Sequence, residues 1–183
     1  MNLEKIEEGF RLFIEAVGDD LKRTGLIETP GRAARGFAEL LGGYNQNDRD
    51  FYKTFECSNN SLVLLRDIEF TSVCEHHFLP FYGLISIGYI PDGRVLGLSK
   101  FSRIVDCFAK RLQIQENLVR DVGMSMVTNL KPAGLFVLSR AKHMCVACRG
   151  VNRGKLEVTT IFTHGKFADY SELDLLKLIA KPE

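Results

Sequence analysis

Residues 62–90 read LVLLRDIEFTSVCEHHFLPFYGLISIGYI, and their pattern determines the expected fold class. Its two flanks, residues 62–70 and 82–90, are rich in β-branched, aromatic and aliphatic side chains, which is typical of β-strands. The tripeptide Pro91-Asp92-Gly93 follows the second flank and predicts a turn. We therefore expect two strands here, with the polar group Cys74-Glu75-His76-His77 between them.

Beyond residue 93 the sequence pattern is first helical and then returns to that of strands. Ser99 predicts the cap of one helix, whose apolar face is Ile104, Val105, Phe108 and Leu112. A second helix, with Leu118, Val122 and Met126 on one face, ends before Pro132. Residues 135–138 and 156–162 predict two more strands, and residues 173–179 a short last helix. This order predicts a two-layer α+β domain in which four mostly antiparallel strands carry two helices on one face. The other face and the edges of such a sheet need cover, which oligomerisation provides.

The first 60 residues have a different pattern. An apolar stripe at helical spacing predicts a first helix over residues 3–21. Thr29-Pro30 predicts an N-cap and the start of a second helix, which ends at Gly42-Gly43. Residues 44–60 are polar and predict irregular structure. We expect residues 1–60 to form an N-terminal helical region and residues 61–183 the sheet-containing domain, together one structural unit.

Composition and charge exclude several classes of protein. With 45% hydrophobic and 26% charged residues among 183, the chain is typical of one soluble globular domain. Charges interrupt the apolar runs, so we expect no membrane span, and the acidic start MNLEKIEEGF differs from a secretory signal, which predicts a cytoplasmic protein. A net charge of +1 argues against nonspecific binding to nucleic acid, while leaving room for a local basic site.

Cysteine and histidine cluster at two places in a chain with only four histidines. In Cys74-Glu75-His76-His77 the cysteine and the second histidine are three residues apart, a spacing from which both reach one zinc ion. If residues 143–149 are extended, His143, Cys145 and Arg149 share one face and Cys148 points the other way. This favours zinc held by Cys74, His77 and Cys145, with His76 and His143 nearby as unliganded groups. Three protein ligands leave a position for water, which is typical of a catalytic zinc site.

Two other zinc proteins compete with this interpretation. A closed structural site would add Cys148 as a fourth ligand and needs a turn over residues 145–148. A zinc deaminase has a glutamate two residues after its histidine ligand and a proline before its Cys-x-x-Cys, and Met144 stands in place of that proline. The remaining cysteines, Cys57 and Cys107, are interpreted as packing residues.

A second constellation predicts an anion site. Ser99, Lys100 and Arg103 place a hydroxyl and two cations in the first turn of a helix, where cations oppose the helix dipole unless an anion binds there. Arg149 would add a charge on the metal side, and the set indicates a polyphosphate. Between the two helices stand Gln115 and Glu116, and a carboxylate accepts the two N–H bonds that a guanine edge offers.

These residues resemble the GTP cyclohydrolase I family. The matching stretches, from Gly25 to Val151 in the family's order, are GLIETPGRAA, DIEFTSVCEHHFLPFYG, IPDGRVLGLSKFSRIVD, RLQIQE and HMCVACRGV. The resemblance implies the tunnelling fold, in which subunit sheets join into a β-barrel. It also implies a toroidal homodecamer of two pentamers with active sites at subunit interfaces. Residues 61–183 would then be the tunnelling-fold catalytic domain.

The resemblance also assigns roles. It implies Zn²⁺ on Cys74, His77 and Cys145, and catalytic roles for His76 and His143. It implies guanine binding by Glu116 with Gln115 beside it, and triphosphate binding by Ser99, Lys100, Arg103 and Arg149. The implied reaction converts GTP and water to 7,8-dihydroneopterin triphosphate and formate, the first step of pterin and tetrahydrofolate synthesis.

Some features leave alternatives open. Cys148 stands where the family usually has alanine, methionine or a similar residue. A related tunnelling-fold enzyme, such as the nitrile reductase of queuosine synthesis, uses a nucleophilic cysteine and has no CEHH zinc site, so the intact motif argues against it. A non-catalytic structural zinc module would show four protein ligands, with Cys148 among them.

Overall fold

A five-stranded sheet forms the body of the protein in the computed structural model, which describes residues 1–180. The strand order is β5-β2-β3-β6-β7, with bounds β2 Val63–Cys74, β3 Pro80–Ile90, β5 Leu112–Gln113, β6 Gly134–His143 and β7 Val158–Gly165. The four long strands pair antiparallel, and short β5 pairs parallel with the end of β2. The four predicted strands are confirmed. The assignment of Leu112 to the apolar face of the preceding helix was wrong, because that helix, α3 (Leu98–Ala109), ends before it and Leu112 begins β5, which was not predicted.

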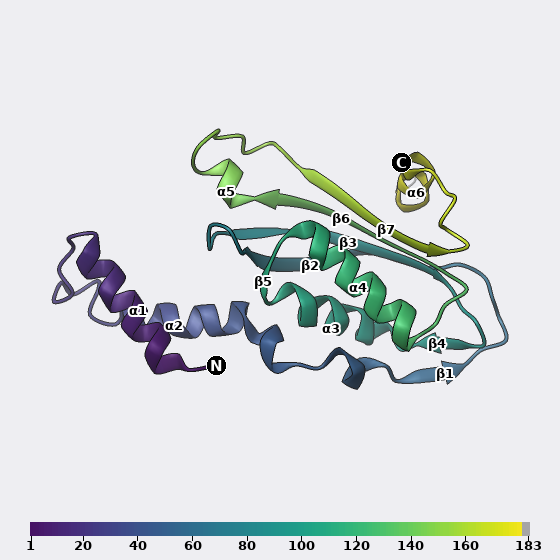
Figure 1. Cartoon of the computed structure of the whole chain (residues 1–183), viewed down its shortest axis with the longest axis horizontal. Helices are drawn as coiled ribbons and strands as arrows, with labels where there is room; N and C mark the ends of the chain where they lie inside the picture. Colours follow the sequence, from purple (N-terminus) through teal and green to yellow (C-terminus); the bar gives the residue numbers. More distant parts are fainter. Residues whose placement is uncertain (181–183) are drawn as a thin grey trace.

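Two helices cover one face of this sheet, as predicted (Figure 1). They are α3, Leu98–Ala109, and α4, Gln115–Asn129. Side chains from α3, α4 and the inner face of the sheet form the main core, whose largest fully buried members include Phe81, Ile85, Tyr89, Phe101, Ile104, Leu118 and Met126. Burying one such side chain stabilises the fold by about 1.5–3 kcal/mol, so this layer fixes where the ends of β2, β3 and β6 lie.

Among residues 1–180, the opposite face of the sheet is covered at one end only. Helix α6, Glu172–Ile179, packs Leu175 against Phe136 and Leu138 of β6, with Phe167 completing this second core. Further along the same face of β6, Lys142 is exposed opposite Tyr82 of β3. The mixed α+β architecture is therefore as predicted, with an open and partly charged half-face toward the His143 end of the sheet.

The N-terminal region is a helical hairpin that extends away from the sheet (Figure 1). Its helices, α1 (Leu3–Ala16) and α2 (Thr29–Leu40), pack on each other through Phe10 and Phe37, whose ring centroids are 5.3 Å apart. The prediction that the first helix reaches residue 21 was wrong, because Gly18 takes φ +82° and turns the chain after α1.

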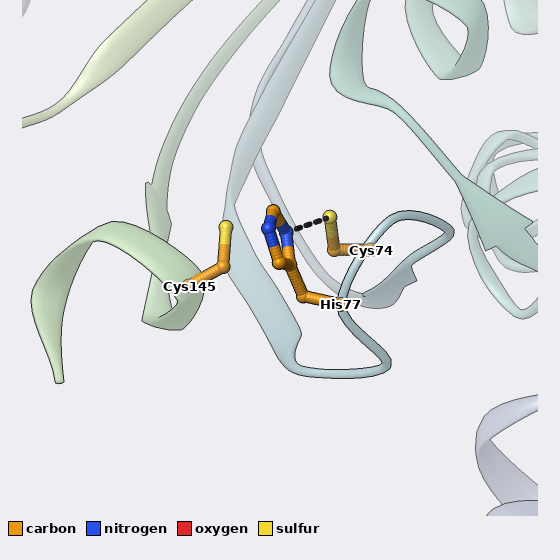
Figure 2. A group of neighbouring side chains, drawn as sticks. All are labelled: Cys74, His77 and Cys145. Carbon is orange, nitrogen blue, oxygen red and sulfur yellow. Dashed lines mark hydrogen bonds between the residues drawn. The ribbon is translucent and has the colours of Figure 1, made fainter. Parts of the chain in front are cut away.

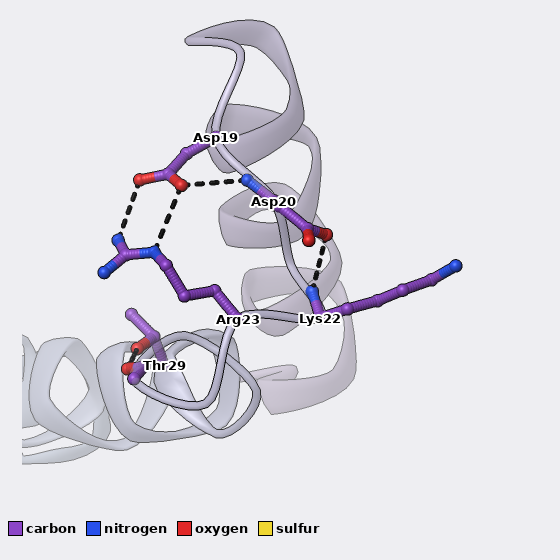
Figure 3. A network of polar contacts seen from close by, with 6 residues as sticks. Asp19, Asp20, Lys22, Arg23 and Thr29 are labelled. Carbon is purple, nitrogen blue, oxygen red and sulfur yellow. Dashed lines mark hydrogen bonds and ion pairs between the residues drawn. The ribbon is translucent and has the colours of Figure 1, made fainter.

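A short polar network fixes the connection between α1 and α2 (Figure 3). Arg23 donates from both Nε and Nη2 to the Asp19 carboxylate, and Asp20 accepts from the backbone N–H of Lys22. Thr29 was predicted as the N-cap but is the first residue of α2, and its hydroxyl donates to Gly25 O at 3.1 Å. Ser99 likewise lies inside α3, where Gly97 holds the cap position.

Residues 42–56 join the hairpin to the body. They contain two 3₁₀ turns, Gly42–Asn45 and Asp48–Phe51, and strand β1 (Thr54–Glu56), which pairs with β4 (Arg94–Leu96). The predicted division at residue 60 stays a prediction, and the last three residues of its second part lie outside the described chain. Within residues 1–180, no helix combines the length and the apolar character needed to cross a membrane.

Candidate active site

Three potential metal ligands converge at one end of the sheet (Figure 2). Cys74 is the last residue of β2, His77 lies in the turn before β3, and Cys145 belongs to the short helix α5, Met144–Ala147. One ligand atom from each lies within 4.8 Å of the others. Cys74 is buried, Cys145 half-buried and His77 exposed, so the group is open to solvent on the histidine side.

Backbone hydrogen bonds hold the turn that carries His77. The Cys74 N–H donates to Leu79 O, and the Phe78 N–H donates to Cys74 O, both at 2.9 Å. The Glu75 N–H donates to Gln113 O of β5 at 3.1 Å. The β2–β3 connection is thereby closed on itself and tied to β5, which positions Cys74 and His77 together.

The separations fit a tetrahedral zinc ion. Bond lengths of about 2.3 Å to sulfur and 2.0–2.1 Å to nitrogen put neighbouring ligand atoms of such an ion roughly 3.5–3.8 Å apart. The Cys74 Sγ to His77 Nδ1 distance is 3.7 Å. Burial raises the pKa of the Cys145 thiol, and the nearby Cys74 raises it further; a bound cation would stabilise both thiolates. Residues 74, 77 and 145 therefore fit a zinc ion with no fourth protein ligand in the group.

The expectation that residues 143–149 are extended was wrong. Strand β6 ends at His143, and residues 144–147 form the single helical turn α5. Cys145 still reaches Cys74 and His77, while Cys148 is exposed and its Sγ donates to Met144 O at 2.9 Å. The ligand set found within residues 1–180 thus excludes Cys148, although strand alternation is not the reason.

His143 lies beside this group in a fixed environment. Its ring stacks on Phe81 of β3 with centroids 4.7 Å apart and planes 2° from parallel, and its Nε2 lies 2.9 Å from Gln115 Oε1. Burial lowers the pKa of His143, and the negative charge of Glu116 opposes that shift. His76 is different, because it is exposed and its Nε2 lies 3.8 Å from Glu75 Oε1.

The predicted phosphate residues are not gathered with the metal ligands in one chain. Ser99, Lys100 and Arg103 lie at the start of α3, which follows β4 at the end of the sheet where β3 finishes (Figure 1). Cys74 and His77 lie at the end where β3 begins, and α3 runs back toward them for 12 residues, about 18 Å, before β5 pairs with the end of β2. Arg149 is exposed just after α5, on the metal side.

Comparison with known proteins shows the family of the chain. The family model described as GTP cyclohydrolase I matches residues 6–178. The chain is 43% identical over 180 residues to GTP cyclohydrolase 1 of Clostridium perfringens, covering 97% of each chain. It is 47% identical over 168 residues to GTP cyclohydrolase 1 of Allorhizobium ampelinum, covering 90% of this chain and 83% of that one. The chain belongs to the GTP cyclohydrolase I family.

The metal group lies within the part of the chain that matches the family. The family match spans all predicted site residues, from Cys74 to Arg149. Two features of this GTP cyclohydrolase I family member escaped the sequence argument: the stacking of Phe81 on His143 and the burial of Gln115. The stacking depends on the pairing of β3 with β6, where Phe81 stands opposite His143. The burial of Gln115 depends on the packing of α4 on β6 and β7, where its amide donates to Ser139 and Val158.

Proposed function

We propose that this enzyme hydrolyses GTP at guanine C8 and rearranges the product to 7,8-dihydroneopterin triphosphate, releasing formate. The observation that carries the proposal is the convergence of Cys74, His77 and Cys145, with His143 held beside them, in a chain of the GTP cyclohydrolase I family. Zinc bound by these three side chains supplies an activated water at neutral pH. That chemistry suits hydrolysis of the electron-poor C8 position.

The chain's own residues move protons and bind the substrate. His143 protonates the imidazole nitrogen of guanine as the C8–N bond opens, and His76, which is exposed at the mouth of the site, carries protons during the later rearrangement. Glu116 is exposed at the start of α4 and close enough to His143 to affect its pKa. Its carboxylate accepts two N–H bonds from the guanine edge, which places C8 toward the metal side.

The triphosphate site is completed by another copy of the chain. Ser99, Lys100 and Arg103 supply a hydroxyl, two cations and a helix N-terminus, and Arg149 adds a cation beside α5. Their separation along the sheet, together with the half-face that α6 leaves open, supports an assembly in which one subunit's α3 faces the next subunit's metal group. We propose a toroidal homodecamer of two pentamers in which the sheets join into a barrel.

A matched pair of cysteine variants tests the ligand set. Cys145→Ser removes a ligand, so it is expected to lose zinc and GTP hydrolysis together. Cys148→Ser changes an exposed thiol three residues away and is expected to keep about one zinc per chain and wild-type turnover. Zinc is measured by elemental analysis and formate by a coupled dehydrogenase. If Cys148→Ser loses zinc as Cys145→Ser does, the site is a closed four-ligand one and the proposed chemistry is wrong.

A further inference from the structure

Gln115 is the first residue of α4, and its side chain is buried and fully engaged in hydrogen bonds. The amide nitrogen Nε2 lies 3.3 Å from Ser139 O, 3.3 Å from Ser139 Oγ and 3.0 Å from Val158 O. Two of these partners are backbone carbonyls, which only accept hydrogen bonds. The opposite amide orientation would set Oε1 against those carbonyls with no hydrogen between them. The strands β6 and β7 therefore fix which end of the amide faces His143.

The other end of the Gln115 amide determines where His143 carries its proton. Gln115 Oε1 lies 2.9 Å from His143 Nε2, and an amide oxygen only accepts. The Nε2 atom must then be the donor, and a neutral imidazole protonated there has its lone pair on Nδ1. The parallel stack of His143 on Phe81 restricts rotation of the ring away from this partner.

We propose that Gln115 is a positioning residue that holds His143 in the Nε2–H tautomer, so that Nδ1 is the atom that exchanges a proton with the substrate. The inference rests on the proposed function for the identity of that substrate. It replaces the expected role of Gln115 beside the guanine. Both hydrogens of its amide are already directed at Ser139 and Val158, and its oxygen is directed at the histidine.

Gln113 provides a matched control for the loss of a buried amide. It lies in β5 two residues before Gln115, is also buried, and donates to Phe108 O and Asp121 Oδ2 at 3.3 and 3.4 Å. Its amide bonds are made to α3 and α4. Gln113→Met and Gln115→Met thus remove the same group from the same segment, and Gln115→Met alone frees His143 Nε2.

The direct readout is the ¹⁵N spectrum of the histidine rings, recorded by magic-angle spinning on the intact zinc-loaded protein at mildly alkaline pH. With four histidines in the chain, the His143 signals are assigned by their loss in His143→Asn. Wild type and Gln113→Met are expected to show a protonated Nε2 and a bare Nδ1 at His143, and Gln115→Met a mixture of tautomers. A protonated Nδ1 in the wild type overturns the proposal, even if Gln115→Met does not fold.

Steady-state kinetics with GTP distinguish a positioning role of Gln115 from direct contact between Gln115 and the substrate. Gln115→Met is expected to lower kcat about 10- to 100-fold, as loss of a histidine's orienting partner does, with KM within about twofold of wild type. A raised KM with unchanged kcat would mean that Gln115 binds the guanine, and would overturn the proposal. If the wild type itself does not turn over GTP, the proposed function fails, and the tautomer in the ring spectra still decides the role of Gln115.

Discussion

Helix α4, which begins at the active site, packs on strand β7 through a position that has room only for glycine. A Cβ added at Gly123 would lie 2.2 Å from Cδ1 and 2.5 Å from Cε1 of Phe162. Carbon atoms in contact are normally about 3.5–4.0 Å apart, so the ring or the helix must retreat by roughly 1.5 Å. Gly123→Ala is therefore an overpacking substitution in the layer that joins α4 to β7.

Two opposing effects determine how much Gly123→Ala changes the free energy of unfolding. Overpacking of a core costs about 1–3 kcal/mol, while alanine in a helix interior is favoured over glycine by about 0.8–1.0 kcal/mol. We expect a net loss of roughly 1 kcal/mol for Gly123→Ala. Gly36→Ala is the control, because Gly36 lies inside α2 and no heavy atom of the described chain lies within 4 Å of its Cβ position, leaving aside its chain neighbours and its own helix backbone. Only the helix preference acts there, so the free energy of unfolding should rise by about 1 kcal/mol.

Thermal unfolding at matched protein concentration measures both variants. A change of 1 kcal/mol shifts Tm by about 2–4 °C in a chain of this size, so the two variants should move in opposite directions and differ by roughly 4–8 °C. Gly123→Ala, Phe162→Leu in combination should recover part of the loss, because the smaller side chain makes room for the methyl group. If Gly123→Ala raises Tm as Gly36→Ala does, the close packing of α4 on β7 is not as described.

Three further predictions concern other parts of the chain. Ser171→Ala removes the cap of α6 and should cost about 1 kcal/mol of helix stability. The Ser171 hydroxyl also donates to the Asp174 carboxylate and holds its pKa below the usual value, so this contact stabilises α6 fully above the ordinary carboxyl pKa and is lost as pH falls through the lowered one. Hydrogen exchange in α6 should therefore quicken on acidification in the wild type but hardly in the variant. Tyr52→Phe removes a hydroxyl 2.7 Å from Ser125 Oγ and should cost about 1 kcal/mol in urea unfolding; an unchanged midpoint would show that this contact contributes nothing. A zinc chelator should lower Tm in the wild type, with no further effect on Cys145→Ser.

The sequence predicted the layered α+β body because that body is built from long periodic segments. Residues 62–70 and 82–90 have strand composition throughout, and they account for most of β2 and β3. Element ends were less accurate. Gly18 ended α1 early, and α5 replaced an expected extension of β6, because such ends depend on one or two residues and on tertiary contacts.

The part of the candidate site that could be predicted is the metal group, because two of its residues are close together in the sequence. Cys74 and His77 are three residues apart, and Cys145 does lie with them in one group although residues 143–149 are not extended as expected. The environment of His143 could not be predicted from the sequence, because its contacts with Phe81 and Gln115 join three segments that only the folded sheet brings together.

The most direct test of the central claim is to incubate the purified, zinc-loaded protein with GTP and follow both products. We expect one formate released per GTP consumed, with a product that gives neopterin fluorescence after oxidation and dephosphorylation. Absence of both signals, from protein that has bound about one zinc per chain at Cys74, His77 and Cys145 and has assembled into its oligomer, would contradict it.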